Sequence, residues 1–371
     1  MLKGVAGTDI AGAASVSLRQ FRLYEEADVT WDPGLNVLSG ENAQGKTSLL
    51  EALFLASTGR LLRGGRDRDA IREGCTWAAI SVRTIGSDSE LSVRIQEGSR
   101  KTASLNGATL PRTSDLLGRM PCVSVTSLDV ELARGEPAER RMYLDLQLSQ
   151  LYSSYLRDLS LYKRALEHRN ALLRRATETH VAVGEFEPWE AQMAVAGSAL
   201  RSARWLFVAD MKEIAAEAHG SVGDGEELGI SYSPKGSEES PDELRAALES
   251  GRTEDLRRGS TSVGPHRDDL AILVGGRDAR LFASQGQQRT AAISLKLATL
   301  DFCAQRGQKP LLLLDDMLSD LDAGRRARLV EWVIVHCGQA ILTCTEESAA
   351  GERLLGRAKL FRVAQGKVRA A

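Results

Sequence analysis

The nine residues GENAQGKTS at positions 40–48 constrain the fold more than any other feature of the sequence. They match the G-x-x-x-x-G-K-[ST] pattern of a phosphate-binding loop (P-loop). An apolar run, LNVLS, precedes them, and a segment of helical character, TSLLEALFLAS, follows. This order lets backbone N–H groups surround an anion at a helix N-terminus. The sequence therefore predicts a nucleotide-binding α/β sheet.

Two loop positions have defined chemical roles in this pattern. The Lys46 ammonium group would reach the outer phosphates of ATP, and the Thr47 hydroxyl would ligate Mg²⁺. We expect the whole loop to bind ATP: Gly40, Glu41, Asn42, Ala43, Gln44, Gly45, Lys46, Thr47 and Ser48.

A second site element is the run LLLL at 311–314, which ends in Asp315 and Asp316. Continuous apolar character is typical of a strand buried on both faces of a parallel sheet. Ligands bind at the carboxyl ends of such strands. Asp315 therefore suits the Mg²⁺ shell together with Thr47, and Asp316 could position or deprotonate the attacking water. We expect Lys46, Asp315 and Asp316 to be the catalytic residues.

The stretch SQGQQ at 284–288 looks like a polar turn, but Ser284 and Gln287 form an S-x-x-Q capping box that predicts a helix start. A helix N-terminus with a glycine and a hydroxyl offers donors to a phosphate. Because the P-loop already supplies one phosphate site, we predict that this stretch binds the γ-phosphate of ATP held by a second copy of the chain. Its residues are Ser284, Gln285, Gly286, Gln287 and Gln288.

The periodicity of the sequence changes along the chain. Short apolar runs up to about residue 110 predict strands, partly antiparallel. An apolar stripe over 144–173 predicts one long helix, and a second helix is expected over 190–218. Residues 220–262 are rich in Gly, Ser and acid, which indicates loops and short helices. Gly275 and Gly276 then suggest a hairpin that ends at Ser284.

The overall charge excludes a generally basic nucleic-acid binder, since 48 basic and 50 acidic residues give a net charge of −2. Any DNA contact must be a local patch, and the best candidate comprises Arg60, Arg63 and Arg66; a solvated charged loop is the alternative interpretation. No run reaches the roughly 20 apolar residues that span a bilayer. Five scattered cysteines without a C-x-x-C pair favour reduced thiols and a cytoplasmic location.

The motifs occur in an order that resembles a known family. The P-loop, SQGQQ, LLLLDD and SDLD (319–322) follow one another as in the ATP-binding-cassette (ABC) heads of the SMC and Rad50 class. Within that class the sequence resembles the RecF family of bacterial gap-repair ATPases over residues 15–371. The stretches that carry the resemblance are GLNVLSGENAQGKTSLLEALFLASTGR, GEPAERRMYLD, GPHRDDL and SQGQQRT.

The resemblance implies an α/β fold: an ABC-type ATPase head, with a P-loop NTPase sheet plus an antiparallel β subdomain, and a helical second lobe. It also implies that SQGQQ is a signature motif acting in trans and that Ser319 and Asp322 belong to the D-loop. We expect a flexible N-terminal tail over 1–14, ATPase lobe I over 15–120 and 305–371, and helical lobe II over 121–304, ending in the signature motif.

In function, the resemblance implies an ATP-dependent DNA-binding protein of recombinational gap repair, DNA replication and the SOS response. ATP would drive formation of a homodimer on double-stranded DNA and on junctions of single- and double-stranded DNA. Hydrolysis, by a weak DNA-stimulated ATPase, would then release the DNA. RecR and RecO would be partners, and loading of RecA would be the outcome.

The sequence departs from the family pattern at several positions. FRLY (21–24) replaces F-R-N-Y, and SLDV (127–130) replaces P-E-D-L, which removes side chains that could make contacts. Ala43 replaces a usual glycine, which is harmless if its backbone keeps a negative φ. The last strand, AILTCT, lacks the histidine of many ABC ATPases, so Thr343 or Thr345 is expected at the γ-phosphate.

Two motifs keep open interpretations. His266, Arg267, Asp268 and Asp269 of GPHRDD would brace the signature helix, touch nucleotide across a dimer, or serve structure alone. Arg140 and Arg141 similarly fit salt bridges or contacts to DNA or protein.

Three other functions fit part of the sequence. An ABC transporter subunit is disfavoured because 238 residues (284 − 46) separate Lys46 from Ser284, whereas a transporter cassette is compact. A Rad50-like or SMC-like architectural ATPase would need a long coiled coil, and no continuous heptad pattern is present. A P-loop phosphotransferase would leave the signature stretch without a purpose.

Overall fold

The computed structural model describes residues 9–10, 12–177 and 179–371, which form two compact units. Unit 1 comprises Arg134–Glu213 and Leu228–Ala283, and unit 2 comprises the described residues up to Ala133 with Ile214–Glu227 and Ser284–Ala371. Residues 121–133 and 284–304 thus group with the ATPase unit, whereas the sequence placed them in the helical lobe. The reason is that residues 122–126 form a strand of the ATPase sheet, against which the helix that follows Ser284 packs.

Most of the predicted N-terminal tail lies outside the described residues. Within it, Asp9–Ile10 (β1) pairs in parallel with Gln308–Lys309 (β13), and strand β2 begins at Ala13.

The central sheet of unit 2 has six strands in the order β17-β16-β4-β15-β14-β9. Neighbours run parallel, except for the antiparallel pair β16 and β17. The strands are β4 (Leu35–Ser39), β9 (Cys122–Thr126), β14 (Leu311–Asp315), β15 (Ala340–Cys344), β16 (Ala358–Ala364) and β17 (Lys367–Ala370). Because parallel strands share one carboxyl edge, the chain that follows Ser39, Asp315 and Cys344 gathers at that edge.

A second, antiparallel sheet has the order β3-β2-β5-β6-β7-β8. Its strands are β2 (Ala13–Phe21), β3 (Tyr24–Thr30), β5 (Trp77–Thr84), β6 (Glu90–Gln96), β7 (Thr102–Leu105) and β8 (Ala108–Thr109). Helix α1 (Lys46–Thr58) packs against strands of both sheets and is buried almost all round, as its apolar sequence requires. The predicted ABC-type α/β fold with an antiparallel subdomain is confirmed.

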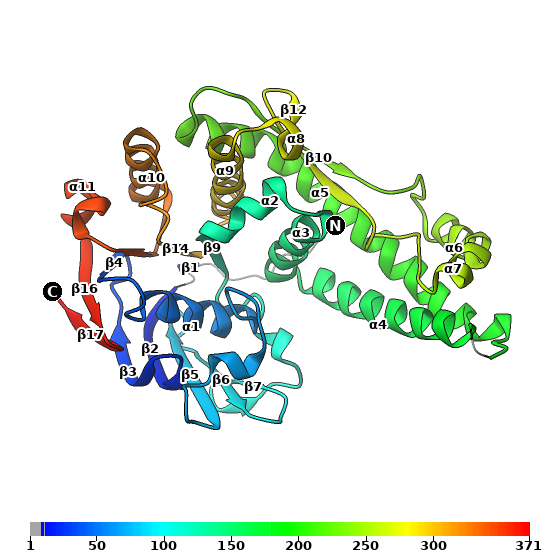
Figure 1. Cartoon of the computed structure of the whole chain (residues 1–371), viewed down its shortest axis with the longest axis horizontal. Coiled ribbons are helices and arrows are strands. Elements are labelled where there is room, and N and C mark those ends of the chain that lie inside the picture. Colours follow the sequence, from blue (N-terminus) through cyan, green and yellow to red (C-terminus); the bar gives the residue numbers. More distant parts are fainter. Residues whose placement is uncertain (1–8, 11, 178) are drawn as a thin grey trace. The chain divides into compact units, whose positions relative to one another are not determined.

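The remaining helices of unit 2 lie mainly beyond the parallel sheet. Figure 1 shows α9 and α10 on the opposite side of that sheet from α1. These helices are α9 (Gln285–Ala304), α10 (Ala323–His336) and α11 (Glu352–Leu355), while α2 (Glu131–Arg134) ends at the border of unit 1.

Unit 1 is mostly helical. Its helices are α3 (Pro137–Leu151), α4 (Ser153–Arg175), α5 (Glu187–Val222), α6 (Pro241–Ser250), α7 (Arg252–Arg258) and α8 (Ala279–Phe282), and α5 continues into unit 2. A small antiparallel sheet has the order β10 (Leu228–Ser233), β11 (Asp269–Val274) and β12 (Arg277–Asp278). The hairpin predicted at Gly275 and Gly276 joins β11 to β12.

The prediction of one helix over 144–173 is wrong. The chain breaks at Tyr152, whose φ of −132° and ψ of 108° are extended, so α3 and α4 are separate helices. Leu148 before the break and Leu159 after it are both buried, which explains why the apolar period runs across it.

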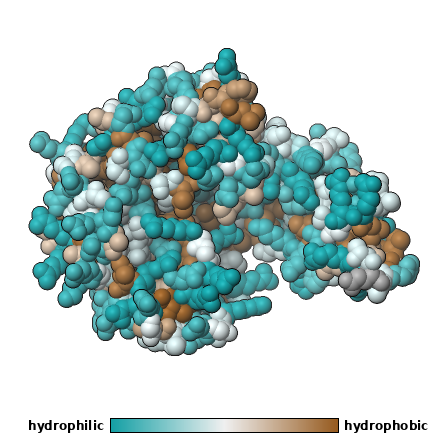
Figure 2. All heavy atoms as spheres, viewed as in Figure 1, coloured by the Kyte–Doolittle hydropathy of each residue, from teal (hydrophilic) through white to brown (hydrophobic). Residues whose placement is uncertain are grey.

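No helix within the described part of the chain is both long and apolar enough to cross a bilayer. The face drawn in Figure 2 is largely hydrophilic, with separate hydrophobic patches.

Candidate nucleotide-binding site

The P-loop connects β4 to α1, as the sequence predicts, and two of its glycines are required by its path. Gly40 and Gly45 have φ values of 152° and 113°. A Cβ atom at Gly40 would lie 2.2 Å from the carbonyl oxygen of Val363, and one at Gly45 would lie 2.7 Å from the Tyr24 hydroxyl. That hydroxyl donates to the carbonyl oxygen of Gly45 at 3.0 Å. The loop is therefore held tightly against β16 and β3.

The condition under which alanine at position 43 would be harmless, a negative φ, is not met, because Ala43 has a φ of 63°. A non-glycine residue in this left-handed region costs about 1 kcal/mol. The loop keeps its turn at this position and tolerates the strain of the methyl group.

Lys46 lies beneath the P-loop and is only 5% exposed. Its ammonium group donates to the carbonyl oxygens of Gly40 and Glu41. Burial lowers its pKa, while the charges of Asp316 and Asp315 act in the opposite direction. The loop's own carbonyls thus hold the cation at the place where the outer phosphates of a P-loop nucleotide bind.

Thr47 and Asp315 meet at the carboxyl edge of the sheet. The Thr47 hydroxyl donates to Oδ1 of Asp315 at 2.7 Å, and the Thr343 hydroxyl donates to the same oxygen at 3.0 Å. A hydroxyl and a carboxylate side by side are the hard oxygen ligands that Mg²⁺ takes together with phosphates and water. The residues present therefore fit the predicted Mg²⁺ site, with Thr47 and Asp315 as its protein ligands.

Asp316 follows Asp315 with a φ of 52°, and its backbone N–H donates to the Thr343 hydroxyl at 2.8 Å. Burial raises the pKa of Asp316, and the negative charge of Asp315 adds to this, although Lys46 opposes it. A carboxylate with a raised pKa is a better proton acceptor. The position and chemistry of Asp316 suit the predicted role beside the attacking water.

Arg63, which the sequence assigned to a group of DNA-binding arginines, contacts this site. Its Nη2 donates to the Thr47 hydroxyl at 3.0 Å and to Oδ2 of Asp315 at 3.2 Å. The contact joins the loop after α1 to both candidate Mg²⁺ ligands. Arg60, Arg63 and Arg66 are all exposed, and DNA binding by them stays a prediction.

The loop that carries Arg63 is anchored by Arg22 of the FRLY stretch. Arg22 makes two hydrogen bonds to the buried carboxylate of Glu51, at 2.7 and 2.9 Å, and another to the carbonyl oxygen of Asp69. Leu23, the departure from the family pattern, is 53% exposed. Sequence reasoning missed the role of Arg22, and its only signal was the FRLY motif itself.

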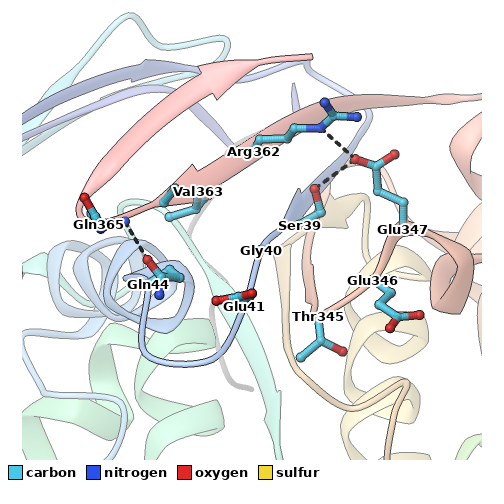
Figure 3. A pocket seen from close by; sticks show the side chains of 11 residues that line it. Ser39, Gly40, Glu41, Gln44, Thr345, Glu346, Glu347, Arg362, Val363 and Gln365 are labelled. Carbon is cyan, nitrogen blue, oxygen red and sulfur yellow. Dashed lines mark hydrogen bonds and ion pairs between the residues drawn. The ribbon is translucent and has the colours of Figure 1, made fainter.

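A hollow of about 630 Å³ lies beside the P-loop (Figure 3). Glu347 on its wall accepts hydrogen bonds from Ser39 and Arg362, both at 3.1 Å. Thr345 lines the hollow, whereas Thr343 is already bonded to Asp315 and Asp316. Of the two threonines, Thr345 is the better placed for a phosphate contact. The lining residues are Ser39, Gly40, Glu41, Gln44, Thr345, Glu346, Glu347, Arg362, Val363, Ala364 and Gln365.

The predicted capping box is present at the start of α9. The Gln287 backbone N–H donates to the Ser284 hydroxyl at 3.3 Å, and the Ser284 N–H donates to the Gln287 side-chain oxygen at 2.8 Å. Arg289, one turn further, donates to the carbonyl oxygen of Asp320 at 2.7 Å. The signature stretch is thereby tied to the predicted D-loop, whose Asp322 caps α10.

The carboxylates of GPHRDD are bound within unit 1. Asp268 is fully buried and accepts two hydrogen bonds from Arg201, at 2.8 and 2.9 Å. Asp269 accepts two from Arg140, at 2.7 and 2.9 Å, and Arg141 donates to the carbonyl oxygen of Asp268 at 2.9 Å. Of the interpretations left open, structural bracing accounts for these groups, including Arg140 and Arg141.

Both ring nitrogens of His266 also have hydrogen-bond partners within unit 1. The carbonyl oxygen of Thr261 only accepts, so Nε2 of His266 carries the proton that bridges their 3.1 Å separation, and Nδ1 accepts from the Tyr162 hydroxyl at 2.6 Å. Burial lowers the pKa of His266 to about 4. Arg267 also donates to the Thr261 carbonyl, at 2.7 Å.

The SLDV stretch keeps the aspartate of the P-E-D-L pattern, as Asp129. Leu128 is 55% exposed, but Asp129 pairs with Lys296 of α9 at 3.0 Å and accepts from the Thr126 N–H at 2.6 Å. The strand end beside Asp315 is therefore linked to the signature helix through Asp129.

Comparison with known proteins places these features in one family. The sequence profile of the RecF/RecN/SMC N-terminal domain matches residues 14–366. The DNA replication and repair protein RecF of Lachnoclostridium phytofermentans is 36% identical over 95% of this chain and 98% of its own length. The RecF of Symbiobacterium thermophilum is 38% identical, with 96% and 97% covered.

Two solved structures also resemble this chain. The recombination mediator protein RecF with ATP, of the RecFOR pathway, superposes with a TM-score of 0.87 at 29% identity, covering 97% of both chains. The Smc head domain of Pyrococcus furiosus superposes with a TM-score of 0.58 at 15% identity, covering 97% of this chain and 96% of its own, which is a likeness of fold.

Proposed function

The chain belongs to the RecF family of the RecF/RecN/SMC group, and from this premise we propose that it is an ATP-dependent DNA-binding protein of recombinational gap repair and DNA replication. The observation that carries the proposal is the 2.7 Å contact between Thr47 and Asp315. It joins the P-loop to the acidic strand end that ATP hydrolysis requires. Curated relatives act in DNA replication and repair, and a solved relative holds ATP.

In this proposal the chain hydrolyses ATP slowly, and DNA stimulates the reaction. Lys46 holds the outer phosphates, and Asp316 orients the attacking water and accepts its proton. Thr47 and Asp315 would hold Mg²⁺, which would supply neutralisation of the phosphate charge. Support comes from the raised pKa of Asp316 and from the burial of Lys46.

The second half of the active site comes from another copy of the chain. Ser284, Gly286 and Gln287 at the start of α9 bind the γ-phosphate across a twofold dimer. Support comes from the position of α9 on the far side of the sheet from α1 (Figure 1). ATP thus closes the dimer, and hydrolysis opens it.

For the DNA-related steps, the support is membership of this family. The closed dimer binds double-stranded DNA and its junctions with single strands, Arg60 and Arg66 contribute contacts, and release follows hydrolysis. RecR and RecO are the partners, RecA loading is the result, and the cytoplasm is the place of action. A relative that belongs to the RecFOR pathway supports this assignment.

Mixed dimers test the trans site. Ser284→Arg protein keeps nucleotide binding but blocks closure, and Lys46→Ala protein loses the phosphate cation, so each alone is expected to lack ATPase activity. In a mixture, one of the two ATP sites of each mixed dimer combines an intact P-loop with an intact signature, and partial ATPase recovery is expected. Ser99→Arg, at an exposed turn, is the matched control and should behave as wild type. No recovery, with mixed dimers shown by native mass spectrometry, would refute the trans site.

A further inference from the structure

Residues 223–227, GDGEE, form an acidic segment between α5 and β10 that contacts the signature motif. The Gln287 side-chain amide donates from Nε2 to Glu226 at 2.7 Å. Its oxygen simultaneously accepts from the Ser284 N–H at 2.8 Å. Gln287 is thereby fixed at both ends of its amide group, and the rotamer that completes the capping box depends on Glu226.

Asp224 of the same segment binds the start of α10. Its two carboxylate oxygens pair with Arg325 and Arg328. Arg328 also donates to the carbonyl oxygen of Val222 at 3.3 Å, the last residue of α5. One acidic side chain therefore joins the end of α5 to two arginines of α10.

Arg325 links Asp224 to the signature motif and to the predicted D-loop. A Cβ atom at Gly286 would lie 2.9 Å from Nη1 of Arg325, so the guanidinium packs directly against the backbone of the signature motif. The backbone N–H of Arg325 donates to the side chain of Asp322, in the predicted D-loop, at 2.9 Å. Arg325 thus lies among the signature motif, the D-loop and Asp224.

The end of α5 is fixed to α9 at a second point. Nδ1 of the buried His219 lies 2.9 Å from the Ser294 hydroxyl, more than two turns after the start of α9. The acidic segment is therefore attached on both sides, to α5 through the chain and to α9 through Gln287.

We propose that Glu226 and Asp224 are positioning residues that set the signature motif and the D-loop as one surface for the second copy of the chain. This inference rests on the proposed function, since it assumes that the signature acts in trans. This role does not require either carboxylate to touch ATP. Glu226 orients Gln287, and Asp224 holds Arg325 against Gly286, so that the N–H donors of α9 are arranged before the dimer closes.

The first test uses Glu226→Gln, which keeps the size of the side chain and removes its charge. Hydrogen–deuterium exchange at residues 284–290 of the nucleotide-free protein should rise about tenfold, since a charge-assisted hydrogen bond is removed. ATP-dependent dimerisation, measured by sedimentation, should weaken by about the same factor. Glu217→Gln, the same change at an exposed position of α5, is the control and should leave both readings unchanged.

A reciprocal exchange separates positioning from general stability. In Glu226→Gln with Gln287→Glu, the amide and carboxylate change places, and the new carboxylate still accepts from the Ser284 N–H. Hydrogen–deuterium exchange at residues 284–290 should return to the wild-type rate. Gln287→Glu alone sets two carboxylates face to face and should raise that rate. A double variant no better protected than Glu226→Gln alone would overturn the inference.

The outcomes also distinguish this inference from the proposed function. If the wild type forms no dimer with ATP, the trans site fails, and the exchange measurements still decide whether Glu226 positions the signature. If the wild type dimerises and Glu226→Gln and Asp224→Asn do so equally well, only the positioning role fails. Binding of a fluorescent ATP analogue by the monomer should be unchanged in both variants, because the P-loop is intact.

Discussion

At the scale of single residues, Arg63 raises a question of competition between cations. Its guanidinium contacts Thr47 and Asp315, the same two side chains that would ligate Mg²⁺. Asp315 is 6% exposed, so its charge is poorly hydrated and needs a cationic partner. Mg²⁺ would compete with Arg63 for the oxygens of these two side chains.

We predict that Arg63→Ala lowers the Mg²⁺ concentration needed for half-maximal binding of a fluorescent ATP analogue by about three- to tenfold. The physical reason is that a partly exposed ion pair, worth about 1 kcal/mol, no longer has to be broken. Titration with Mg²⁺ at fixed analogue concentration measures the shift. Arg60→Ala, in the same loop, should leave the midpoint unchanged. A higher Mg²⁺ requirement in Arg63→Ala would show instead that Arg63 assists the nucleotide.

At the scale of elements, GPHRDD joins α3, α4 and α5 to the small sheet of unit 1. Asp268 and Asp269 are neutralised by Arg201 and Arg140, and His266 lies between Tyr162 and Thr261. Buried polar groups of this kind cost stability unless every partner is present. The stability of unit 1 therefore depends on Asp268 and Asp269 being charged and on His266 being neutral.

We predict that unit 1 loses stability as the pH falls from 6.5 to 4. The pKa of His266 is about 4 in the folded chain and near 6.5 when unfolded, so the unfolded state binds more protons in this window. Stability should therefore rise with pH across it, by at most about 3 kcal/mol. Urea unfolding at several pH values measures the effect. His266→Asn should flatten the dependence, and His180→Asn, at an exposed site, should not.

Sequence patterns predicted those elements whose cause is local. The P-loop, the buried strand before Asp315 and the capping box at Ser284 each follow from a motif or a period within a few residues. The break at Tyr152 was not predicted because the apolar period continues on both sides of it.

Two contacts of the site could not be predicted from the sequence, for a different reason. The contact of Arg63 with Asp315 joins residues 252 positions apart, and that of Glu226 with Gln287 joins residues 61 apart. Neither Arg63 nor Glu226 is distinguished locally from its charged neighbours. The positive φ of Ala43 reflects a loop path fixed by packing on both sides, which overrides the preference of alanine.

At the scale of the whole molecule, the near-zero net charge means that DNA binding must depend on a local basic patch. With a net charge of −2, long-range attraction is weak, and affinity must come from a few arginines. Since Arg63 is engaged at the nucleotide site, Arg60 and Arg66 are the members of the predicted patch that remain for phosphate contacts.

We predict that Arg60→Glu with Arg66→Glu weakens duplex DNA binding and reduces the slope of log K against log salt by roughly 0.9 for each DNA phosphate that is no longer neutralised. The reason is that fewer counterions are released from the DNA. Fluorescence anisotropy at several salt concentrations measures the slope, and ATP binding should be retained. Arg369→Glu, the charge reversal of one exposed arginine on β17, is the control. An unchanged slope in the double variant would return these arginines to a solvated loop.

The length of α5 gives the molecule a mechanical property. Its 36 residues form one rod of about 54 Å that is common to both units. Near its C-terminal end, the contact of His219 with Ser294 of α9 is a pivot between this helix and the acidic segment. A tilt of the end of α5 about that pivot would move the acidic segment in the opposite direction and would reach Gln287 through its contact with Glu226.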